Sequence, residues 1–372
     1  MKINFLSGDL ALTKNRTGVH LVHHRAIESL TSDDAFPETV KASCYCKESQ
    51  IKRTNPNYTN EIYSDNIAFS FKGARALAYF LPIELFFGSS DVYICDGMIP
   101  HTMNAACKIA IVHDLMVKIY PENYPLISRL YLSVWLQQVK RADAIIAMSN
   151  TTKDDLVRIA GIDESRIIVS HPGFEMQEAV EYDPADLSFD IEKPFVFCIG
   201  DMRPNKNLLN AIKGFQEALR NHPELRLLIA GSQAGQYEML LDYVKENSLE
   251  DNVVFLGYVS AEEKAALYEN ALALVFVSLY EGFGIPILEA ASQKCPVITS
   301  NCSSMKEIAE NCSILVNPHD PSEIANAILS LFNKETRDRV IEAQCALPEK
   351  YSWEKAYSIL KKCITDHTSS AS

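Results

Sequence analysis

The segment from Ala271 to Ala291 combines three elements in a fixed order, and this order limits the folds open to the chain. Its first part, Ala271–Val277, is an unbroken apolar run of the kind found in parallel strands buried on both faces. Two glycines follow, Gly282 and Gly284, and Pro286 then stands at a position typical of the first helical residue. The segment therefore predicts a parallel sheet in which a buried strand leads through a glycine-rich loop into a helix.

The start of this helix is a candidate anion site. Backbone N–H groups converge at a helix N-terminus, and the helix dipole favours negative charge there. Glycine also lets a ligand approach the backbone closely. We therefore expect the backbone amides of the loop to bind an anion such as a diphosphate, and the residues concerned are Gly282, Phe283, Gly284 and Ile285.

Two carboxylates flank the predicted anion site, Glu281 on the loop and Glu289 in the helix. A carboxylate repels phosphate, but it accepts hydrogen bonds from hydroxyl groups. A nucleotide sugar has phosphates in its middle and hydroxyl-bearing rings at both ends, so it would satisfy the whole segment. The alternative is that Glu289 only complements the helix dipole and that Glu281 is a solvated loop residue.

The spacing Glu281-x7-Glu289, with its glycine loop, resembles the signature of family 4 of the retaining glycosyltransferases. This family has the GT-B fold. The resemblance covers nearly the whole chain, and it is dense in the second half and sparse before about residue 107. It implies that Glu281 orients the donor sugar and that Glu289 binds the ribose hydroxyls.

The chain is long enough for two domains, since its 372 residues are too many for one ordinary core. Strands and helices alternate through the second half, which predicts a parallel, doubly wound sheet. With the resemblance, the expected fold class is α/β of the GT-B type: two Rossmann-like doubly wound domains facing across a cleft. We expect an acceptor-side domain at residues 1–180, a donor domain at residues 190–350, and a helix at residues 351–366 that crosses back to the first domain. The acidic segment Ala179–Lys193 is predicted to link the domains.

A second loop supplies candidate cations. Arg203 and Lys206 follow the strand that ends at Gly200, and ligands bind at this edge of open parallel sheets. The two residues could hold a diphosphate or could be ordinary solvated cations. The segment resembles the family's Gly-x-x-x-Pro-x-Lys-Asn loop, whose basic residues bind the donor diphosphate, and this resemblance favours the first interpretation.

The resemblance implies roles for three further residues. Gly18 matches a glycine that faces the donor phosphates, although many relatives have a second glycine there. His113 lies in a His-Asp-Leu sequence at the end of a predicted strand, and the resemblance implies that it contacts the sugar. Tyr258 lies where the family packs the nucleotide base.

The expected chemistry needs neither a metal nor a cofactor. No Asp-x-Asp follows a strand to hold Mg²⁺, so Arg203, Lys206 and the loop amides are predicted to stabilise the leaving diphosphate. The candidate catalytic residues are Glu281, His113, Arg203 and Lys206. The resemblance implies retention of the anomeric configuration by front-face attack.

The predicted activity is transfer of a hexosyl group, mannose-, rhamnose- or glucose-like, from a nucleotide-diphosphate sugar. The predicted acceptor is a growing glycan or lipid-linked saccharide in the synthesis of cell-surface polysaccharide. Two alternatives stay open, a GT-B nucleotide-sugar epimerase and an inactive nucleotide-sugar-binding subunit. An epimerase would need a further acidic and histidine set, and an inactive subunit would not need Glu281, Glu289, Arg203 and Lys206 together.

Charge and cysteine content restrict the partners and the compartment. A net charge of −13 argues against a nucleic-acid partner, because phosphate contacts need a basic surface. Ten cysteines without a Cys-x-x-Cys pair favour reduced thiols and a cytoplasmic location. No stretch is predicted to span a bilayer. The stretch Phe71–Phe87 is either a core helix or a weak peripheral contact with the inner face of the membrane.

Overall fold

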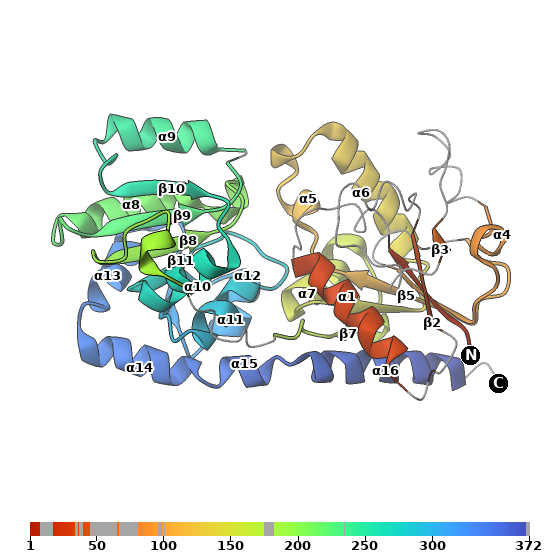
Figure 1. Ribbon diagram of the computed structural model, residues 1–372. Coiled ribbons are helices and arrows are strands. Elements are labelled where there is room, and N and C mark those ends of the chain that lie inside the picture. Colours follow the sequence, from red (N-terminus) through yellow and green to blue (C-terminus); the bar gives the residue numbers. More distant parts are fainter. Residues whose placement is uncertain are drawn as a thin grey trace. The chain divides into compact units, whose positions relative to one another are not determined.

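The chain forms two compact units, the first built from residues 1–173 and 353–372 and the second from residues 174–352. The computed structural model describes residues 1–7, 18–33, 36, 40–44, 65–66, 81–95, 99, 101–174, 182–233 and 235–369. Figure 1 shows the elements of each unit along the chain. The crossing from the first unit to the second lies at Gly173–Phe174, ahead of the acidic segment Ala179–Lys193 that was predicted as the linker.

The first unit contains a seven-stranded parallel sheet with the order β3-β2-β1-β4-β5-β6-β7. Its strands β2 and β3 lie in a polar stretch whose composition gave no strand signal. The strands are β1 (Ile3–Ser7), β2 (Val40–Cys44), β3 (Asp65–Asn66), β4 (Val92–Cys95), β5 (Cys107–Val112), β6 (Ala144–Ala147) and β7 (Ile167–Val169).

The helices of the first unit include the C-terminal helix of the chain. The hydroxyl of Tyr357 and the ammonium of Lys361 both reach Asp33 Oδ2, at 2.5 and 2.6 Å. At Gly173 a Cβ would lie 2.2 Å from the backbone N of Trp353, so only glycine permits the helix to start there. The helices are α1 (Gly18–Thr31), α4 (Glu84–Phe87), α5 (Met116–Ile119), α6 (Leu126–Val139), α7 (Asn150–Ala160) and α16 (Trp353–Ser369).

The second unit contains a six-stranded parallel sheet with the order β10-β9-β8-β11-β12-β13. Its strands are β8 (Phe195–Ile199), β9 (Arg226–Ala230), β10 (Val253–Gly257), β11 (Ala273–Phe276), β12 (Val297–Ser300) and β13 (Ile314–Val316). Its helices are α8 (Leu208–Leu219), α9 (Tyr237–Glu246), α10 (Ala261–Asn270), α11 (Ile285–Ser292), α12 (Ser303–Ala309), α13 (Pro321–Ser330), α14 (Lys334–Gln344) and α15 (Leu347–Lys350).

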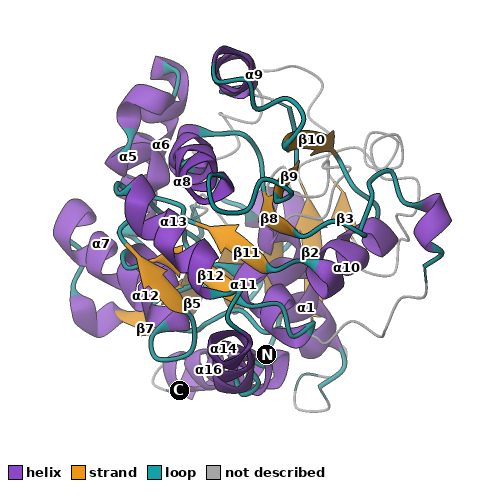
Figure 2. Cartoon of the chain, turned by 90° about the vertical axis from the view of Figure 1, so that its left-hand side faces the viewer, coloured by secondary structure: helices purple, strands orange, loops and turns teal. Residues whose placement is uncertain are grey.

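Alternation along the strands explains why each sheet is covered on both faces. On β8, Val196 and Cys198 pack into one core, whereas Phe195 and Phe197 pack into the core on the opposite face. Figure 2 shows the strands in orange among the helices in purple. The two parallel α/β units confirm the predicted fold class.

Strand order decides where ligands can bind. In the second sheet the chain runs outward from β8 to β10 and then returns to place β11 on the other side of β8. The neighbours β8 and β11 therefore form a topological switch point, and the loops after their carboxyl ends diverge to leave room for a ligand. Both loops that the sequence singled out, after Ile199 and after Phe276, begin at this point.

The stretch Phe71–Phe87 falls mostly outside the described residues, so a helix or an interfacial surface there stays a prediction. Its last part contains only the short helix α4, and Leu85 in this helix is 65% exposed. Among the described residues, no helix is long and apolar enough to cross a membrane.

Candidate active site

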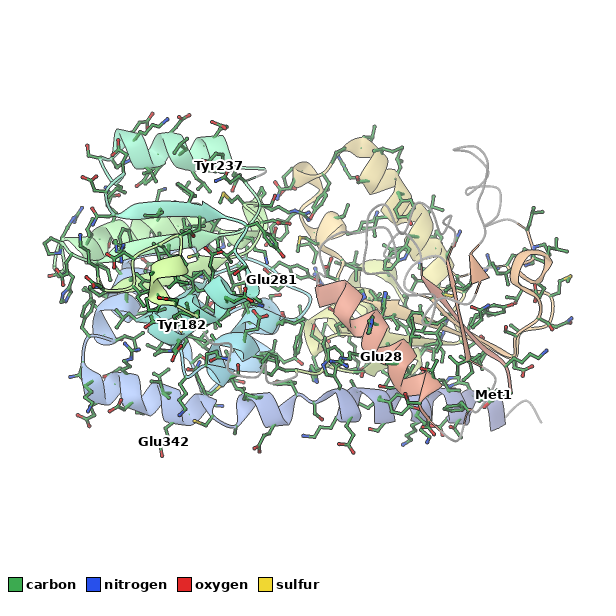
Figure 3. All side chains as sticks on the ribbon, in the orientation of Figure 1. Met1, Glu28, Tyr182, Tyr237, Glu281 and Glu342 are labelled. Carbon is green, nitrogen blue, oxygen red and sulfur yellow. The ribbon has the colours of Figure 1, made fainter. Side chains whose placement is uncertain are left out.

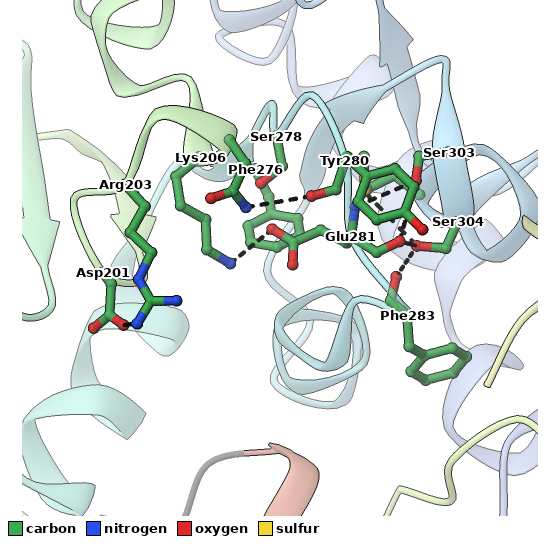
Figure 4. Close-up of polar contacts among 12 residues, drawn as sticks. Asp201, Arg203, Lys206, Phe276, Ser278, Tyr280, Glu281, Phe283, Ser303 and Ser304 are labelled. Atoms are coloured by element: carbon green, nitrogen blue, oxygen red, sulfur yellow. Dashed lines mark hydrogen bonds and ion pairs between the residues drawn. The ribbon is translucent and has the colours of Figure 1, made fainter. Parts of the chain in front are cut away.

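The carboxyl ends of β8 and β11 bring Lys206 and Glu281 together across 75 residues of sequence. Lys206 Nζ donates a hydrogen bond to Glu281 Oε1 at 2.7 Å, and the side chains are only 19% and 14% exposed. Figure 3 shows Glu281 within the second unit, and Figure 4 shows the pair at close range. Lys206 Nζ also lies 5.1 Å from the centre of the Phe276 ring, a contact that favours the charged ammonium.

This ion pair changes the electrostatics expected from the sequence. The two residues were predicted to act on different parts of a donor, Lys206 on the diphosphate and Glu281 on the sugar. In the structure the ammonium neutralises the carboxylate, so an anion can approach the loop without meeting an uncompensated negative charge. Lysine has three N–H donors, and it can keep Glu281 while two of them bind a phosphate.

Arg203 does not join this pair. Its side chain is 57% exposed, and its nearest ion partner is Asp201, at 3.4 Å from Nη2 to Oδ2. Figure 4 shows Arg203 and Asp201 beside each other and apart from Glu281. The two predicted cations therefore lie in different environments. Lys206 is mostly buried and bonded to Glu281, whereas Arg203 is exposed. A role for Arg203 in binding a diphosphate stays a prediction.

Two glycines allow the loop after β8 to pass close to the end of β9. Gly200 and Gly231 have φ angles of 136° and 141°, values that other residues rarely adopt. A Cβ on Gly231 would lie 2.0 Å from the carbonyl oxygen of Gly200. A Cβ on Gly200 would lie 3.0 Å from Cε of Lys206, so this glycine leaves space for the lysine stem. Gly200 thus makes room for Lys206, and its predicted part in donor binding stays a prediction.

Two buried asparagines hold the loop after β8 against the loop after β11. Asn205 Nδ2 donates to the carbonyl of Tyr280 at 3.3 Å, and the amide of Leu279 donates to the carbonyl of Asn205 at 2.7 Å. Asn207, in the left-handed region at a φ of 56°, donates from Nδ2 to the carbonyl of Val277 at 3.0 Å. These bonds fix the distance between the backbones that carry Lys206 and Glu281.

Two serines at the start of α12 hold the backbone of Glu281. Ser303 Oγ accepts from the amide of Glu281 at 3.2 Å, and Ser304 Oγ donates to its carbonyl at 2.9 Å. Ser304 also bonds the carbonyl of Phe283 (Figure 4). These serines and both asparagines were not predicted from the sequence, because their partners lie on other loops. A run of small polar residues between predicted elements was the only local signal.

The glycine loop enters α11 as predicted, with one difference in register. The helix begins at Ile285, so Pro286 is its second residue, and Gly284 precedes the helix with a φ of 139°. Pro286 has no N–H, and the amide of Ile287 donates to the carbonyl of Gly284 at 3.0 Å, so the backbone amides that could bind an anion here are those of Ile285 and the glycine loop before it. The side chain of Phe283 is buried and packs edge-on against Tyr351, with ring centres 5.4 Å apart. Only the backbone of Phe283 can serve the predicted anion site.

Glu289 lies in the second turn of α11, and the first turn contains no acidic residue. Its carboxylate accepts from Lys264 Nζ at 2.7 Å on one oxygen and from the Tyr268 hydroxyl at 2.8 Å on the other. Lys264 and Tyr268 are four residues apart on α10, so both face the same neighbour. Burial raises the pKa of Tyr268 well above its ordinary value, and the charge of Glu289 raises it further. Tyr268 therefore keeps its proton and acts as a donor.

This network argues against the alternative in which Glu289 only complements the helix dipole. Its carboxylate is 17% exposed and is bonded to the neighbouring helix α10. Lys264 and Tyr268 were not predicted as site residues, although their four-residue spacing on a predicted helix is present in the sequence. Tyr258, the residue predicted to pack a nucleotide base, is 76% exposed at the end of β10. Its ring is accessible, and stacking on a base stays a prediction.

In the first unit, His113 follows the buried strand β5. Its Nε2 lies 3.0 Å from Nε2 of His23 on α1, and the ring centres are 5.0 Å apart. One ring must donate and the other must accept, so at least one of the two imidazoles is neutral while the bond is present. Thr152 Oγ1 donates to the carbonyl of His113 at 3.1 Å and fixes its backbone. His23 was not predicted, and a contact of His113 with a sugar stays a prediction.

Gly18 is the first residue of α1, as the sequence predicted. The loop that precedes it lies outside the described residues, so its place beside donor phosphates stays a prediction. Among the described residues, no group of three or more His, Cys, Asp or Glu side chains is arranged to hold a metal ion.

Comparison with known protein families gives one match for each half of the chain. Residues 31–178 match the family described as Glycosyltransferase Family 4, and residues 180–345 match the family described as Glycosyl transferases group 1. The junction between the matches lies a few residues after the crossing between the two units at Gly173–Phe174.

Curated relatives include proteins of polysaccharide synthesis. The chain is 27% identical over 268 residues to O-antigen chain mannosyltransferase B of Escherichia coli, which is 69% of each chain. It is 29% identical over 221 residues to the O-antigen chain mannosyltransferase RfbU of Salmonella typhimurium, which is 59% of each chain. The chain thus spans about two thirds or less of the length of these relatives.

Solved structures share the fold over almost the whole chain. HepE of Anabaena, in complex with UDP and glucose, superposes with a TM-score of 0.74 at 17% identity, over 98% of this chain and 100% of that one. The lipopolysaccharide outer core galactosyltransferase WaaB superposes with a TM-score of 0.70 at 18% identity, over 98% of this chain and 99% of that one. At such identities the likeness establishes the architecture alone.

Proposed function

Because the chain belongs to the GT4-type glycosyltransferases with the GT-B fold, we propose that it is a retaining hexosyltransferase of cell-surface polysaccharide synthesis. The donor is a nucleotide-diphosphate sugar, and the acceptor is a growing glycan or a lipid-linked saccharide. The O-antigen mannosyltransferases among the relatives favour a mannosyl group over the other hexoses that the sequence left open.

The observation that carries the proposal is the buried pair of Lys206 and Glu281 at the switch point of the second sheet, beside the start of α11. A binding site for a simple anion would not need a half-buried carboxylate. A site for hydroxyl groups alone would not need a glycine-rich backbone at the N-terminus of a helix. A sugar joined to a diphosphate uses both features at once.

The bond that breaks joins the anomeric carbon of the sugar to the diphosphate oxygen. Negative charge grows on the leaving diphosphate as this bond lengthens, and donors already in place stabilise it at no cost of reorganisation. Lys206 and the backbone amides of Gly282–Ile285 provide such donors, and Arg203 adds a charge from the exposed end of its loop. Positive charge grows at the anomeric carbon, where the Glu281 carboxylate stabilises it.

Glu289 is proposed to bind the ribose hydroxyls. Lys264 and Tyr268 already hold its two oxygens from one side and so fix its orientation. A carboxylate oxygen accepts more than one hydrogen bond, so both oxygens retain capacity for a ribose diol. Retention follows if the acceptor hydroxyl attacks from the face that the diphosphate leaves, with the leaving phosphate accepting the proton.

A panel of nucleotide sugars tests the function directly. The purified chain is incubated with GDP-mannose, UDP-glucose and a rhamnosyl nucleotide, each with and without short saccharide-lipid acceptors. The expected result is release of the nucleoside diphosphate that depends on an acceptor, and a product with the anomeric configuration of the donor by mass spectrometry and NMR. Glu281→Gln serves as the control for a contaminating activity.

The alternatives give different outcomes in the same panel. An epimerase would interconvert a donor or release the nucleoside diphosphate without any acceptor. An inactive binding subunit would bind the nucleotide in calorimetry and release nothing. A product with inverted anomeric configuration would contradict the retaining mechanism, but it would still support the proposed transfer of a hexosyl group.

Transfer is expected to survive chelation by EDTA with no more than about a twofold change in rate. The physical reason is that fixed cations of the protein neutralise the leaving group in place of a metal. Among these cations, Lys206 is mostly buried. The measurement is the initial rate in EDTA compared with the rate in added Mg²⁺ or Mn²⁺. A rate abolished by EDTA and restored by either metal would contradict the proposed role of the cations.

A further inference from the structure

A second histidine lies against His113 in the first unit. His23 is on α1 (Figure 1), 90 residues away in the sequence, and it is only 1% exposed. The Nε2 atoms of the two rings are 3.0 Å apart. On another side, the Phe5 ring of β1 packs edge-on against His23, with ring centres 5.4 Å apart. His23 thus contacts both β1 and the segment that follows β5.

The two histidines lie at the edge of the first sheet where a ligand is expected. His113 follows the carboxyl end of β5, and α1 is the first helix after β1. Ligands of open parallel sheets bind outside the carboxyl ends of the strands, above all where the strand order reverses. In this sheet the chain runs from β1 out to β3 and then returns to place β4 on the other side of β1. Because β5 is the next neighbour of β4, His113 is close to this reversal.

The short distance between the two Nε2 atoms requires one proton between them. Two nitrogens that both carry protons repel each other at 3.0 Å, and two that both lack protons cannot form a hydrogen bond. The pair of rings can therefore be neutral or carry one positive charge, whereas a second charge breaks the bond. The protonation of one ring thus fixes what the other ring can do.

The shared proton also decides the state of the second nitrogen of His113. In a pair with one charge, His113 is either the cation, with protons on both nitrogens, or the neutral acceptor at Nε2. A neutral imidazole that accepts at Nε2 must carry its proton on Nδ1. Nδ1 of His113 is therefore protonated in both arrangements. A lone neutral imidazole, by contrast, can carry its proton on either nitrogen.

Charged side chains close to the pair in sequence bond to groups outside it. The two residues that follow His23 on α1 both reach one glutamate, and the aspartate after His113 accepts from a backbone amide. On α7, whose Thr152 bonds the carbonyl of His113, the buried aspartate is held by an arginine. These contacts are His24–Glu28 at 3.3 Å, Arg25–Glu28 at 3.0 Å, Asp114 with the amide of Met116 at 2.8 Å, and Asp155–Arg158 at 2.7 Å. We therefore expect the two imidazoles themselves to set the charge at His113.

We propose that His23 is a positioning residue for His113. It holds the His113 ring through Nε2 and, by sharing the proton, keeps Nδ1 of His113 protonated, so that this nitrogen donates a hydrogen bond to an oxygen of the bound sugar. This role rests on the proposed transferase function and on the contact of His113 with the sugar that the resemblance implies. It adds a residue that no sequence pattern indicated, and it gives the direction of the hydrogen bond to the sugar.

A purely structural role for His23 predicts different behaviour. A buried imidazole needs hydrogen-bond partners, and His113 could serve only as such a partner. Any substitution of His23 that keeps the fold would then leave transfer unchanged. In the proposed role the hydrogen bond itself matters. A side chain that can donate to Nε2 of His113 should therefore preserve activity that an apolar side chain of similar size loses.

NMR of the full chain with 15N-labelled histidine rings tests the pair without donor or acceptor. His23→Gln and His113→Gln identify the two rings among the nine histidines of the chain. In the wild type we expect a scalar coupling across the hydrogen bond between the two Nε2 atoms, and a 15N shift of His113 Nδ1 typical of a protonated nitrogen. In His23→Leu the coupling should be absent, and the Nδ1 shift should move toward that of a mixture of tautomers.

Transfer rates test the role in the reaction. His23→Leu should lower kcat/KM about tenfold or more, because the His113 ring loses the bond that orients it. His23→Gln should recover most of this loss, since its amide can donate to Nε2 and so leave the proton on Nδ1. The affinity for a nucleoside diphosphate, which lacks the sugar, should match the wild type in both variants. Melting temperatures show whether each variant is folded.

His24→Gln is the matched control. His24 is the next residue of α1, its side chain is 29% exposed, and its ion partner is Glu28. The substitution should leave the NMR signals of the pair, the rate of transfer and the affinity for a nucleoside diphosphate unchanged.

Two results would overturn the proposal. One is a wild type without a coupling between the two Nε2 atoms, whatever its transfer activity. The other is a folded His23→Leu variant that transfers at the wild-type rate, or a His23→Gln variant that is no more active than His23→Leu. A failure of the proposed function is distinguishable from both, because the wild type would then transfer from no donor in the panel.

Discussion

Replacing Glu281 by glutamine is expected to lower turnover by about tenfold or more. Glutamine has nearly the size of glutamate, and its amide oxygen can still accept a hydrogen bond from Lys206. It lacks the negative charge that would stabilise a cationic anomeric carbon. An interaction that strengthens as the reaction proceeds acts on turnover more than on ground-state binding. The measurement is the rate of acceptor-dependent diphosphate release at saturating donor.

The ion pair adds an expectation that sequence reasoning did not contain. In the wild type, part of the hydrogen-bonding capacity of Lys206 is directed at Glu281, 2.7 Å away. In the Gln variant the ammonium loses its charged partner and is free to bind phosphate more strongly. The affinity for a nucleoside diphosphate should therefore stay the same or rise while turnover falls.

Glu310→Gln is a matched control, since Glu310 is exposed at the end of α12 in the same unit. It should leave both the rate and the affinity unchanged. A Glu281→Gln variant with turnover close to that of the wild type would remove Glu281 from the reaction and leave it a structural partner of Lys206.

Replacing Lys206 by alanine is expected to weaken binding of a nucleoside diphosphate roughly ten- to 150-fold. The loss of one charge-assisted contact accounts for about 1.5–3 kcal/mol. The structure adds a second cause, because the Glu281 carboxylate is only 14% exposed and would be left without its partner beside the incoming diphosphate. Isothermal titration calorimetry with the nucleoside diphosphate measures the change.

A double variant separates the two causes. If the unpaired carboxylate contributes, Lys206→Ala should cost less affinity in a chain that already contains Glu281→Gln than in the wild type. The coupling free energy of this cycle is expected at about 1–3 kcal/mol, the range found for residues in direct contact. Additive effects would show that the ion pair between Lys206 and Glu281 has no influence on diphosphate binding.

Alanine substitutions at two other cations serve as comparisons for Lys206→Ala. Arg203→Ala should have a smaller effect than Lys206→Ala, because Arg203 is 57% exposed and its ion partner is 3.4 Å away. Lys245→Ala, at an exposed position in the last turn of α9, should have none. Equal losses of affinity in Lys206→Ala and Lys245→Ala would mean that both substitutions act only through the net charge of the protein.

Local patterns in the sequence predicted the parallel sheet of the second unit and most of its elements, and the family resemblance completed the predicted fold class. The apolar run Ala271–Val277 predicted β11, and the alternation of strands and helices predicted a parallel sheet. These patterns work because burial is periodic along a strand or helix and is written into neighbouring residues. The polar segment that contains β2 (Val40–Cys44) lacks this periodicity, so the strand was not predicted.

The resemblance and the loop pattern also named Glu281, Glu289 and Lys206 as site residues. They could not say which side chains meet, because a contact between loops depends on the order of the strands. Lys206 and Glu281 are 75 residues apart and come together only because β11 inserts beside β8. The same holds for Glu289 and its partners on α10, which lie 25 and 21 residues away.

The amino-acid sequence by itself determined the parallel α/β sheet of the second unit and the glycine loop that leads into α11, since these follow from the pattern of apolar residues and from the conformational freedom of glycine. Only the tertiary structure decided that Lys206 neutralises Glu281 and that Ser303 and Ser304 hold the Glu281 loop. The physical reason is the same in each case. Hydrophobicity states how much a residue gains by being buried, whereas the packing of distant segments decides which residues are covered and which charges become neighbours.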